Sequence, residues 1–185
     1  LTKLPDLGTV TFQSVALSPS GNFLFLSKVG DSLLYRYNLA SEVKEVFLGA
    51  AAAPGYQAGT GTAGHFGGFY HMVTSSIPGQ TIIGTDPTNH MLLVVQGDTW
   101  GPSAVNVEEG HIEMYACQVS DGSLSLAGAP GSAKCRTPRG LSWSRGVLFF
   151  TETQKIRKVA ANYVYDLLDS AAMSGQSATA VLAHP

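Results

Sequence analysis

A polar cluster at residues 86–90 has the residue types that metal binding and acid–base chemistry need. Asp86, Asn89 and His90 fall within five residues of one another. Carboxylate and amide oxygens are ligands for Ca²⁺, and a histidine ring can exchange a proton near neutral pH. The same residue types also occur in turns, where their side chains hydrogen-bond the neighbouring backbone. We expect a turn here and keep a divalent-metal site as the alternative.

Three further histidines, His65, His71 and His111, could meet at a metal such as Zn²⁺ only through the tertiary fold. No His-Glu-x-x-His sequence or paired Cys-x-x-Cys supports such a site. The sequence GTGTAG at 59–64 matches a dinucleotide-binding pattern, but that pattern needs a helix directly after it. The residues that follow, HFGGF at 65–69, do not predict a helix. We therefore expect a connecting loop at 59–64 and no bound cofactor.

The clearest charge asymmetry lies in residues 134–158, which carry seven basic side chains and one acidic one. Residues 1–133 carry four basic and ten acidic side chains. Candidates for contacts with phosphate or carboxylate groups are Arg136, Arg139, Arg145, Lys155 and Arg157. Strand alternation places Lys155 and Arg157 on one face of a strand, with the other three arginines in nearby loops. The simpler reading, which we favour, is a polar outer strand balanced by acidic neighbours.

The two cysteines, Cys117 and Cys135, flank a predicted hairpin. They could form a disulfide if their Cβ atoms come close together. Buried free thiols are the simpler expectation, and the disulfide is the alternative. A disulfide would favour a secreted or extracellular protein, whereas the sequence alone leaves the compartment open.

Alternation of apolar and polar residues predicts short strands in three similar runs. The predicted strands are Ser14–Ser18, Phe23–Ser27 and Leu33–Asn38, then His71–Ser75, Thr81–Thr85 and Met91–Gln96, then Leu141–Ser144, Val147–Thr151 and Lys155–Val159. Tight turns join the strands within each run, which is typical of an antiparallel meander. A short fourth strand follows the first run at 41–49, and a hairpin is expected around Asp121-Gly122.

Repeated four-stranded antiparallel units predict an all-β fold of the β-propeller class. We expect one domain over residues 1–185, with units at about 12–49, 64–100, 101–134 (degenerate) and 135–161. Common propellers have more units than the roughly four that fit this length, so another segment or chain could complete the ring. The sequence opens with Leu1, which fits a processed product, an excised domain or a fragment.

The segment after the third run is the one part of the sequence that predicts a helix. Tyr163, Leu167 and Leu168 have helical spacing, with Asn162 as the N-cap and Gly175 as the stop. We therefore expect a short helix near the C-terminus.

The overall composition fits many short buried strands. Only 13% of residues are charged and 44% are hydrophobic, with 21 glycines for tight turns. The net charge of -2 gives no reason to expect a polyanionic partner. No apolar run approaches the roughly 20 residues that span a bilayer, so we expect no membrane-spanning segment.

The third run, PRGLSWSRGVLFFTETQKIRKV at 138–159, has the order of motifs found in one known repeat. It begins with Pro-x-Gly-Leu, continues with Gly-Val-Leu-Phe-Phe, and ends with an Ile-x-x-Val pattern. The second run keeps Thr85-Asp86 and Asn89-His90, and the first run, GNFLFLSKVGDSLLYRY, is the loosest copy. These runs resemble the NHL-repeat β-propellers over about half of the chain.

This resemblance implies a scaffold and no particular reaction. We expect a non-catalytic binding or scaffold module that presents its loops to a protein or peptide partner. One alternative is a metal-dependent propeller hydrolase or lyase that uses Ca²⁺ or Zn²⁺. The other is an RNA-binding NHL domain that uses the basic segment 134–158.

Overall fold

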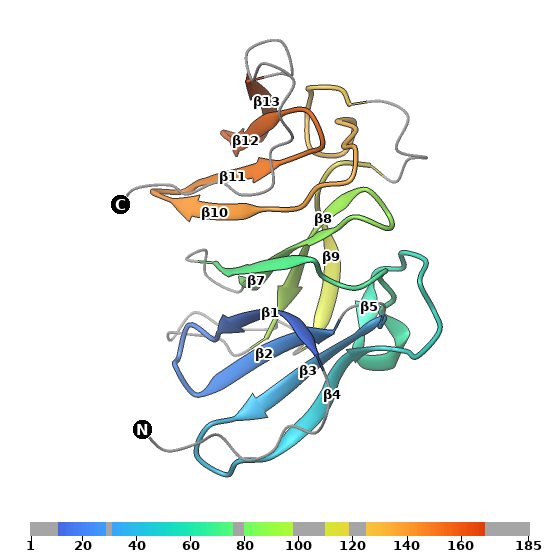
Figure 1. The fold of residues 1–185 in the computed structure, drawn as a ribbon, viewed down its shortest axis with the longest axis vertical. Helices are drawn as coiled ribbons and strands as arrows, with labels where there is room; N and C mark the ends of the chain where they lie inside the picture. Colours follow the sequence, from blue (N-terminus) through green and yellow to red (C-terminus); the bar gives the residue numbers. More distant parts are fainter. Residues whose placement is uncertain (1–10, 29–30, 76–79, 98–109, 119–124, 169–185) are drawn as a thin grey trace.

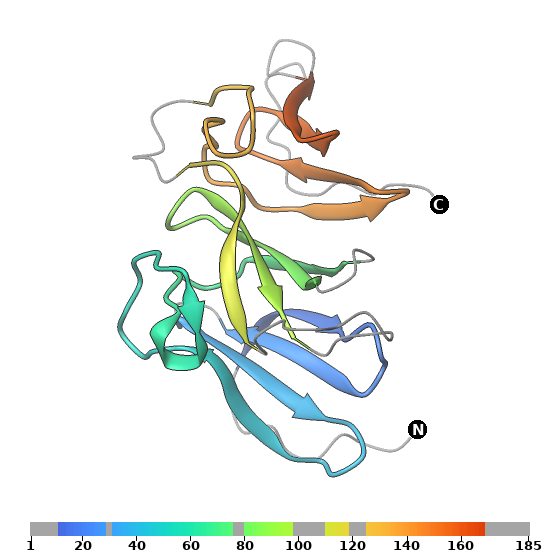
Figure 2. The same cartoon turned by 180° about the vertical axis from the view of Figure 1, so that it is seen from behind.

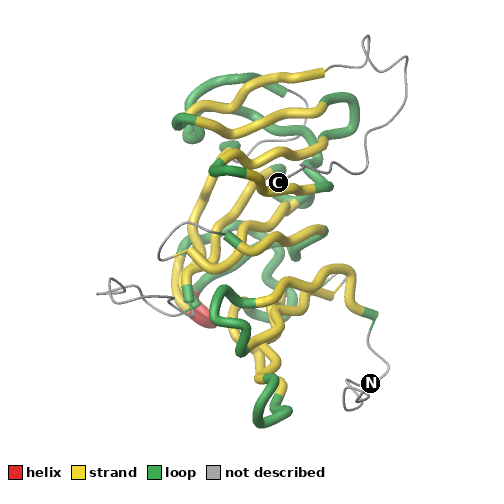
Figure 3. Tube along the Cα trace, turned by 90° about the vertical axis from the view of Figure 1, so that its left-hand side faces the viewer, coloured by secondary structure: helices red, strands yellow, loops and turns green. Residues whose placement is uncertain are grey.

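The computed structural model describes residues 11–28, 31–75, 80–97, 110–118 and 125–168. These residues form three antiparallel β-sheets, stacked along the long axis of the molecule (Figure 1). Among them the one helical segment is the 3-10 turn η1 at Gly61–Ala63, red in Figure 3. The expectation of an all-β fold is confirmed.

The first sheet has the strand order β1-β2-β3-β4. Its strands are β1 (Phe12–Leu17), β2 (Phe23–Lys28), β3 (Leu33–Asn38) and β4 (Lys44–Gly49). The turn after β1 is closed by Ser18, whose N–H donates to the Phe23 carbonyl at 2.8 Å and whose Oγ accepts from the Phe23 N–H at 3.1 Å. Gly21 has a φ of 77° in this turn, a conformation that glycine adopts without strain.

The second sheet has the strand order β5-β9-β8-β7-β6. Its strands are β5 (Gly59–Thr60), β6 (His71–Thr74), β7 (Gln80–Asp86), β8 (Met91–Gln96) and β9 (His111–Ala116). The last four form a meander, and the short β5 pairs with β9 at the outer edge. Both faces of this sheet are covered, which explains why five consecutive residues of β8, Met91–Val95, are apolar and buried.

The third sheet has the strand order β10-β11-β12-β13. Its strands are β10 (Leu141–Ser144), β11 (Val147–Thr151), β12 (Ile156–Ala160) and β13 (Tyr163–Leu168). Each of the nine strands expected from the sequence occurs in the structure, with its ends shifted by no more than two residues.

The predicted helix near the C-terminus is wrong at Tyr163–Leu168, which is a strand. Asn162 does not cap a helix. Ala161 and Asn162 have φ values of 46° and 58°, as the two-residue turn of a β-hairpin requires. This turn pairs Tyr165 with Lys158, and Val164 is buried against the core. The remainder of the expected helix, and the Asp121-Gly122 hairpin, lie outside the described residues.

Two apolar clusters hold the three sheets together. The first fills the space between the first and second sheets, with Phe25, Leu34, Phe66, Ile82 and Leu93 among its fully buried members. The second cluster lies between the second and third sheets and includes Ile83, Leu92, Leu148, Phe150 and Val164. Figure 2 shows this three-layer stack from behind.

The first strands of the three meanders, β1, β6 and β10, are neighbours along one side of the stack. The described residues do not close into a ring (Figure 1). The second sheet is covered on both faces, whereas the first and third sheets each lie at an end of the stack.

The GTGTAG sequence is not a simple loop, because it forms β5 and η1. Its glycines serve close packing: a Cβ atom on Gly64 would lie 2.7 Å from Ile112 Cγ2 and 2.9 Å from Leu48 Cδ1. The unit boundaries expected from the sequence remain a prediction. In the structure β9 is the fourth strand of the second meander.

Candidate functional site

The seam between the first two sheets is closed by hydroxyl groups at the end where β2 ends and β6 begins. Ser27 Oγ donates to the Phe69 carbonyl at 2.9 Å and accepts from the Phe69 N–H at 3.0 Å. Ser14 Oγ accepts from the Met72 N–H at 2.9 Å. Short polar side chains on one sheet therefore fix the backbone that leads into the next.

The seam between the second and third sheets repeats this arrangement. Thr85 occupies the place of Ser27, and its Oγ1 donates to the Arg139 carbonyl at 2.7 Å. His71 occupies the place of Ser14, and its Nδ1 accepts from the Leu141 N–H at 3.0 Å. Burial lowers the pKa of His71, which favours the neutral ring that can accept this bond.

The polar cluster at residues 86–90 builds a turn. The Asp86 carboxylate accepts from the backbone N–H groups of Gly67 at 2.7 Å, Thr88 at 3.1 Å and Asn89 at 3.0 Å, and from Asn89 Nδ2 at 2.7 Å. Burial raises the pKa of Asp86, and these four hydrogen bonds oppose that rise. His90 Nδ1 accepts from the Thr137 N–H at 3.1 Å. All three candidate side chains therefore make contacts within the framework.

The other histidines each contact a different partner. His111 Nδ1 is 3.2 Å from Thr60 Oγ1, and His65 pairs through its backbone with Gln57. Within the described residues no group of three or more His, Cys, Asp or Glu side chains could hold a metal ion.

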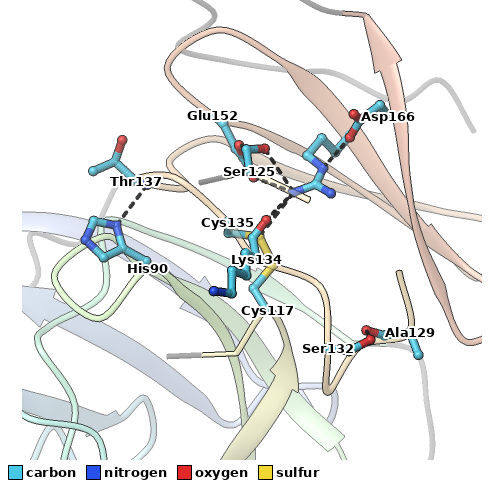
Figure 4. Close-up of a disulfide and its surroundings, with 11 residues drawn as sticks. His90, Cys117, Ser125, Ala129, Ser132, Lys134, Cys135, Thr137, Glu152 and Asp166 are labelled. Atoms are coloured by element: carbon cyan, nitrogen blue, oxygen red, sulfur yellow. Dashed lines mark hydrogen bonds and ion pairs between the residues drawn. A yellow bond between two sulfur atoms is a disulfide. The ribbon is translucent and has the colours of Figure 1, made fainter. Parts of the chain in front are cut away.

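Arg157 is fully buried, and it contacts acidic and carbonyl oxygens of Glu152, Asp166 and Lys134. Figure 4 labels these three partners. Its Nη1 lies 2.8 Å from Glu152 Oε1 and donates to the Lys134 carbonyl at 2.8 Å. Its Nε lies 2.7 Å from Asp166 Oδ1, an ion pair by distance whose N–H direction does not complete a hydrogen bond. This side chain faces the protein interior.

The remaining basic candidates do not form one surface. Lys155 Nζ pairs with Asp166 Oδ2 at 2.6 Å. Arg136, Arg139 and Arg145 are exposed. Arg139 precedes β10 and Arg145 follows it in the turn to β11, so these two side chains lie at opposite ends of that strand.

Cys117 and Cys135 form a disulfide in the structure (Figure 4). Their Cα atoms are 5.4 Å apart and the two residues are separated by 18 positions in the sequence. Of the two alternatives the structure therefore has the disulfide. The bond ties the end of β9 to the segment that leads into β10.

A pocket of about 280 Å³ opens at the seam between the first two sheets. Its walls include Gln13, Lys28, Phe69, Tyr70, Pro87 and Thr88. The Arg139 guanidinium lies over the Tyr70 ring, 5.0 Å from the ring centre. The pocket, Tyr70 and Arg139 thus lie at the same end of the sheets.

Sequence reasoning identified Arg139 but not Lys28 or Tyr70. These residues come from β2 and from the lead-in to β6, and the sequence gives no signal that joins them. The pair Gly67-Gly68 before Phe69 could have indicated a close approach. A Cβ atom on Gly68 would lie 2.6 Å from the Asp31 carbonyl oxygen, and the Gly68 φ is 98°.

The sequence matches no protein-family model and no curated protein at a significant level. Solved structures share the fold at low identity. A protein of unknown function from Bacteroides thetaiotaomicron is 14% identical with a TM-score of 0.61, over 85% of this chain and 36% of that one. An auxiliary nutrient binding protein from the same organism is 16% identical with a TM-score of 0.54, over 81% of this chain and 36% of that one.

The structure of U3-55K is 15% identical with a TM-score of 0.52, over 87% of this chain and 40% of that one. This chain therefore spans 36 to 40% of the length of these three structures. The likeness supports the fold alone. In the described part of the chain no helix is long and apolar enough to cross a membrane.

Proposed function

We propose that the chain is a segment of an NHL-like β-propeller that works as a non-catalytic binding and scaffold module for a protein or peptide partner. The observation that carries the proposal is that the polar side chains between the sheets hydrogen-bond the backbone of the protein itself. Ser14, Ser27, His71, Thr85 and Asp86 all bond the backbone at the seams or in a turn. Their reactive atoms fix the loops, so the loops form a rigid surface for contact.

The arrangement of the sheets supports the propeller interpretation. Three four-stranded meanders stack with their first strands side by side, and the two seams use equivalent hydrogen bonds. One matched structure is that of an auxiliary nutrient binding protein, and at 16% identity the likeness supports the shared fold only. Another segment or chain completes the ring in this proposal.

The RNA-binding alternative has fewer basic side chains available than the sequence suggested. Arg157 is buried between Glu152 and Asp166, and Lys155 is paired with Asp166. Three exposed arginines remain, on different ends of β10. A protein or peptide partner therefore fits this surface better than a phosphate backbone, which needs a continuous row of cations.

The disulfide supports a secreted or extracellular location, because disulfides persist in oxidising compartments. Mass spectrometry of the natively expressed protein, alkylated without reduction, should show both cysteines blocked from modification.

A displayed peptide library tests the binding function. We expect selection on the purified chain to enrich related peptides, and isothermal titration calorimetry on the synthetic peptides to give micromolar dissociation constants. EDTA should leave that affinity unchanged. If no related peptides enrich, or if enriched peptides bind only the unfolded chain, the proposal is wrong.

A further inference from the structure

The pocket at the seam between the first two sheets is small, and it is lined by a cation and an aromatic side chain. Its volume of about 280 Å³ lies just below the range of pockets for whole small-molecule ligands, and it suits a single side chain. Phe69, Tyr70 and Pro87 give it apolar and aromatic walls, and Lys28 supplies an ammonium group.

Lys28 is only loosely engaged by its own neighbour. Its Nζ lies 3.8 Å from Asp31 Oδ2, beyond hydrogen-bonding distance, and its side chain is 41% exposed. Asp31 Oδ2 already accepts a bond from Tyr35 Oη at 3.2 Å. An incoming carboxylate could therefore take a hydrogen bond from the Lys28 ammonium without breaking an existing one.

Arg139 is a second cation, and it lies next to Tyr70, one of the residues that line the pocket. Its backbone is fixed, because its N–H donates to the Thr151 carbonyl at 2.9 Å and its carbonyl accepts from Thr85 Oγ1. Its exposed guanidinium lies over Tyr70, one of the pocket walls. Within the described part of the chain this guanidinium makes no ion pair. Stacking on Tyr70 leaves the N–H groups at its edge available to an anion.

Two carboxylates lie near the residues that line the pocket. Asp31 Oδ2 is 3.8 Å from Lys28 Nζ. The buried Asp86 carboxylate is held by four hydrogen bonds to the turn and to Gly67. A Cβ atom on Gly67 would lie 2.4 Å from Thr88 Cβ, so the glycine is needed where these two pocket-lining residues meet.

We propose that this pocket binds the carboxylate side chain of an acidic peptide, with Lys28 and Arg139 as the anion contacts and Tyr70 as the apolar support. The proposal rests on the proposed binding function and names its ligand chemistry. An adjacent aromatic or aliphatic residue of the peptide would pack on Tyr70 and Pro87, the partly exposed apolar side chains that line the pocket.

The test uses acetyl-Phe-Glu-amide and its matched neutral analogue acetyl-Phe-Gln-amide as probes, with binding followed by NMR. We expect the amide signals of Gly67, Gly68 and Phe69 to shift with the acidic probe, and its affinity to exceed that of the neutral probe. Lys28→Met and Arg139→Met should each weaken the acidic probe about three- to five-fold, as expected for exposed ion pairs. They should leave the neutral probe unchanged.

Arg145→Met is the matched control, because it removes the same charge from an exposed residue at the far end of β10. It should change neither affinity. Equal binding of the two probes, or equal effects of Arg145→Met and Lys28→Met, would overturn the proposal. A third probe, 3-phenylpropionate, separates the source of the carboxylate: if it binds and the peptide does not, the ligand is a free acid and the peptide assignment is wrong.

These outcomes are separate from those of the peptide selection. If selected peptides bind with an affinity that does not depend on Lys28 or Arg139, the chain still binds peptides, but this pocket is not the binding site.

Discussion

The role of Arg157 is set by the residues that surround it in the fold, and its place in the sequence does not reveal that role. In the sequence it belongs to the most basic segment of the chain. In the fold it is fully buried, and of its two ion-pair partners Glu152 is the one that is itself almost fully buried. A buried ion pair gives little net stability, but removal of one partner leaves an uncompensated charge inside the protein.

This arrangement predicts an unequal response to loss of charge along β12. Arg157→Met should lower the free energy of unfolding by about 3–5 kcal/mol, because Glu152 loses its counter-charge. Lys155→Met, which breaks a partly exposed pair with Asp166, should cost about 1 kcal/mol or less. Urea denaturation followed by fluorescence measures both. Similar losses for the two variants would contradict the buried role of Arg157.

His71 predicts a pH dependence of stability. Burial holds its folded-state pKa below the ordinary value of 6.5, so the unfolded chain binds the proton more readily. The stabilisation is therefore complete above about pH 6.5 and is lost as the pH falls through that value towards the folded pKa. His71→Gln keeps a side-chain acceptor for the Leu141 N–H and does not titrate. The free energy of unfolding, measured from pH 7.5 to 5.0, should fall less steeply in this variant than in the parent.

At the scale of the elements, the two seams share one feature, a hydroxyl side chain that hydrogen-bonds the backbone of the next sheet. Ser27 and Thr85 are each the next-to-last residue in the second strand of a meander, and each bonds the backbone that enters the next sheet. Both hydroxyls are buried, so a lost bond leaves an unsatisfied backbone group in an apolar setting.

Ser27→Ala and Thr85→Val should each lower the free energy of unfolding by about 1–2 kcal/mol. The residues belong to different seams and share no partner, so the double variant should show the sum of the two losses within about 0.5 kcal/mol. Chemical denaturation of the four proteins forms the cycle. A double variant that loses far more than the sum would show that the seams open together.

Most strands could be predicted from the sequence because they bury one face, and a strand with one buried face shows alternating apolar and polar residues. Met91–Val95 lacks alternation since both faces of its sheet are covered, yet its apolar run and flanking turns still indicated a strand. Tyr163–Leu168 was misread because its apolar residues also fit helical spacing, and the deciding feature is the turn at Ala161-Asn162. The pocket could not be predicted, since Lys28 and Tyr70 meet only through the seam.

At the scale of the whole molecule, the disulfide ties the second sheet to the segment that enters the third. It closes a loop with a sequence separation of 18 residues, for which chain entropy predicts a stabilisation of about 3 kcal/mol. The double variant Cys117→Ala/Cys135→Ala should lose about this much free energy of unfolding, measured by urea denaturation. A reducing agent should reproduce the loss in the parent and have no effect on the variant.

The outer face of the first sheet carries apolar side chains, and among the described residues no other sheet covers them. Val15, Leu17 and Val46 are 57%, 47% and 50% exposed, whereas the corresponding layer between the other sheets is buried. Exposed apolar patches of this kind are typical of interaction surfaces. A second copy of the chain can therefore cover this face, with its own apolar surface removed from water in the process.

We accordingly expect concentration-dependent self-association through β1, measurable by sedimentation equilibrium. Val15→Thr with Leu17→Thr keeps one β-branched residue and adds another, so the strand should be retained while the apolar area falls. The dissociation constant should rise about thirty-fold, since the two side chains each contribute on the order of 1 kcal/mol of apolar burial. Val43→Thr is the control, because Val43 is equally exposed at 56% but lies between β3 and β4. If both changes weaken association equally, the chains associate through non-specific hydrophobic contacts. If only the β1 variant does so, the outer face of the first sheet is the surface that meets another chain.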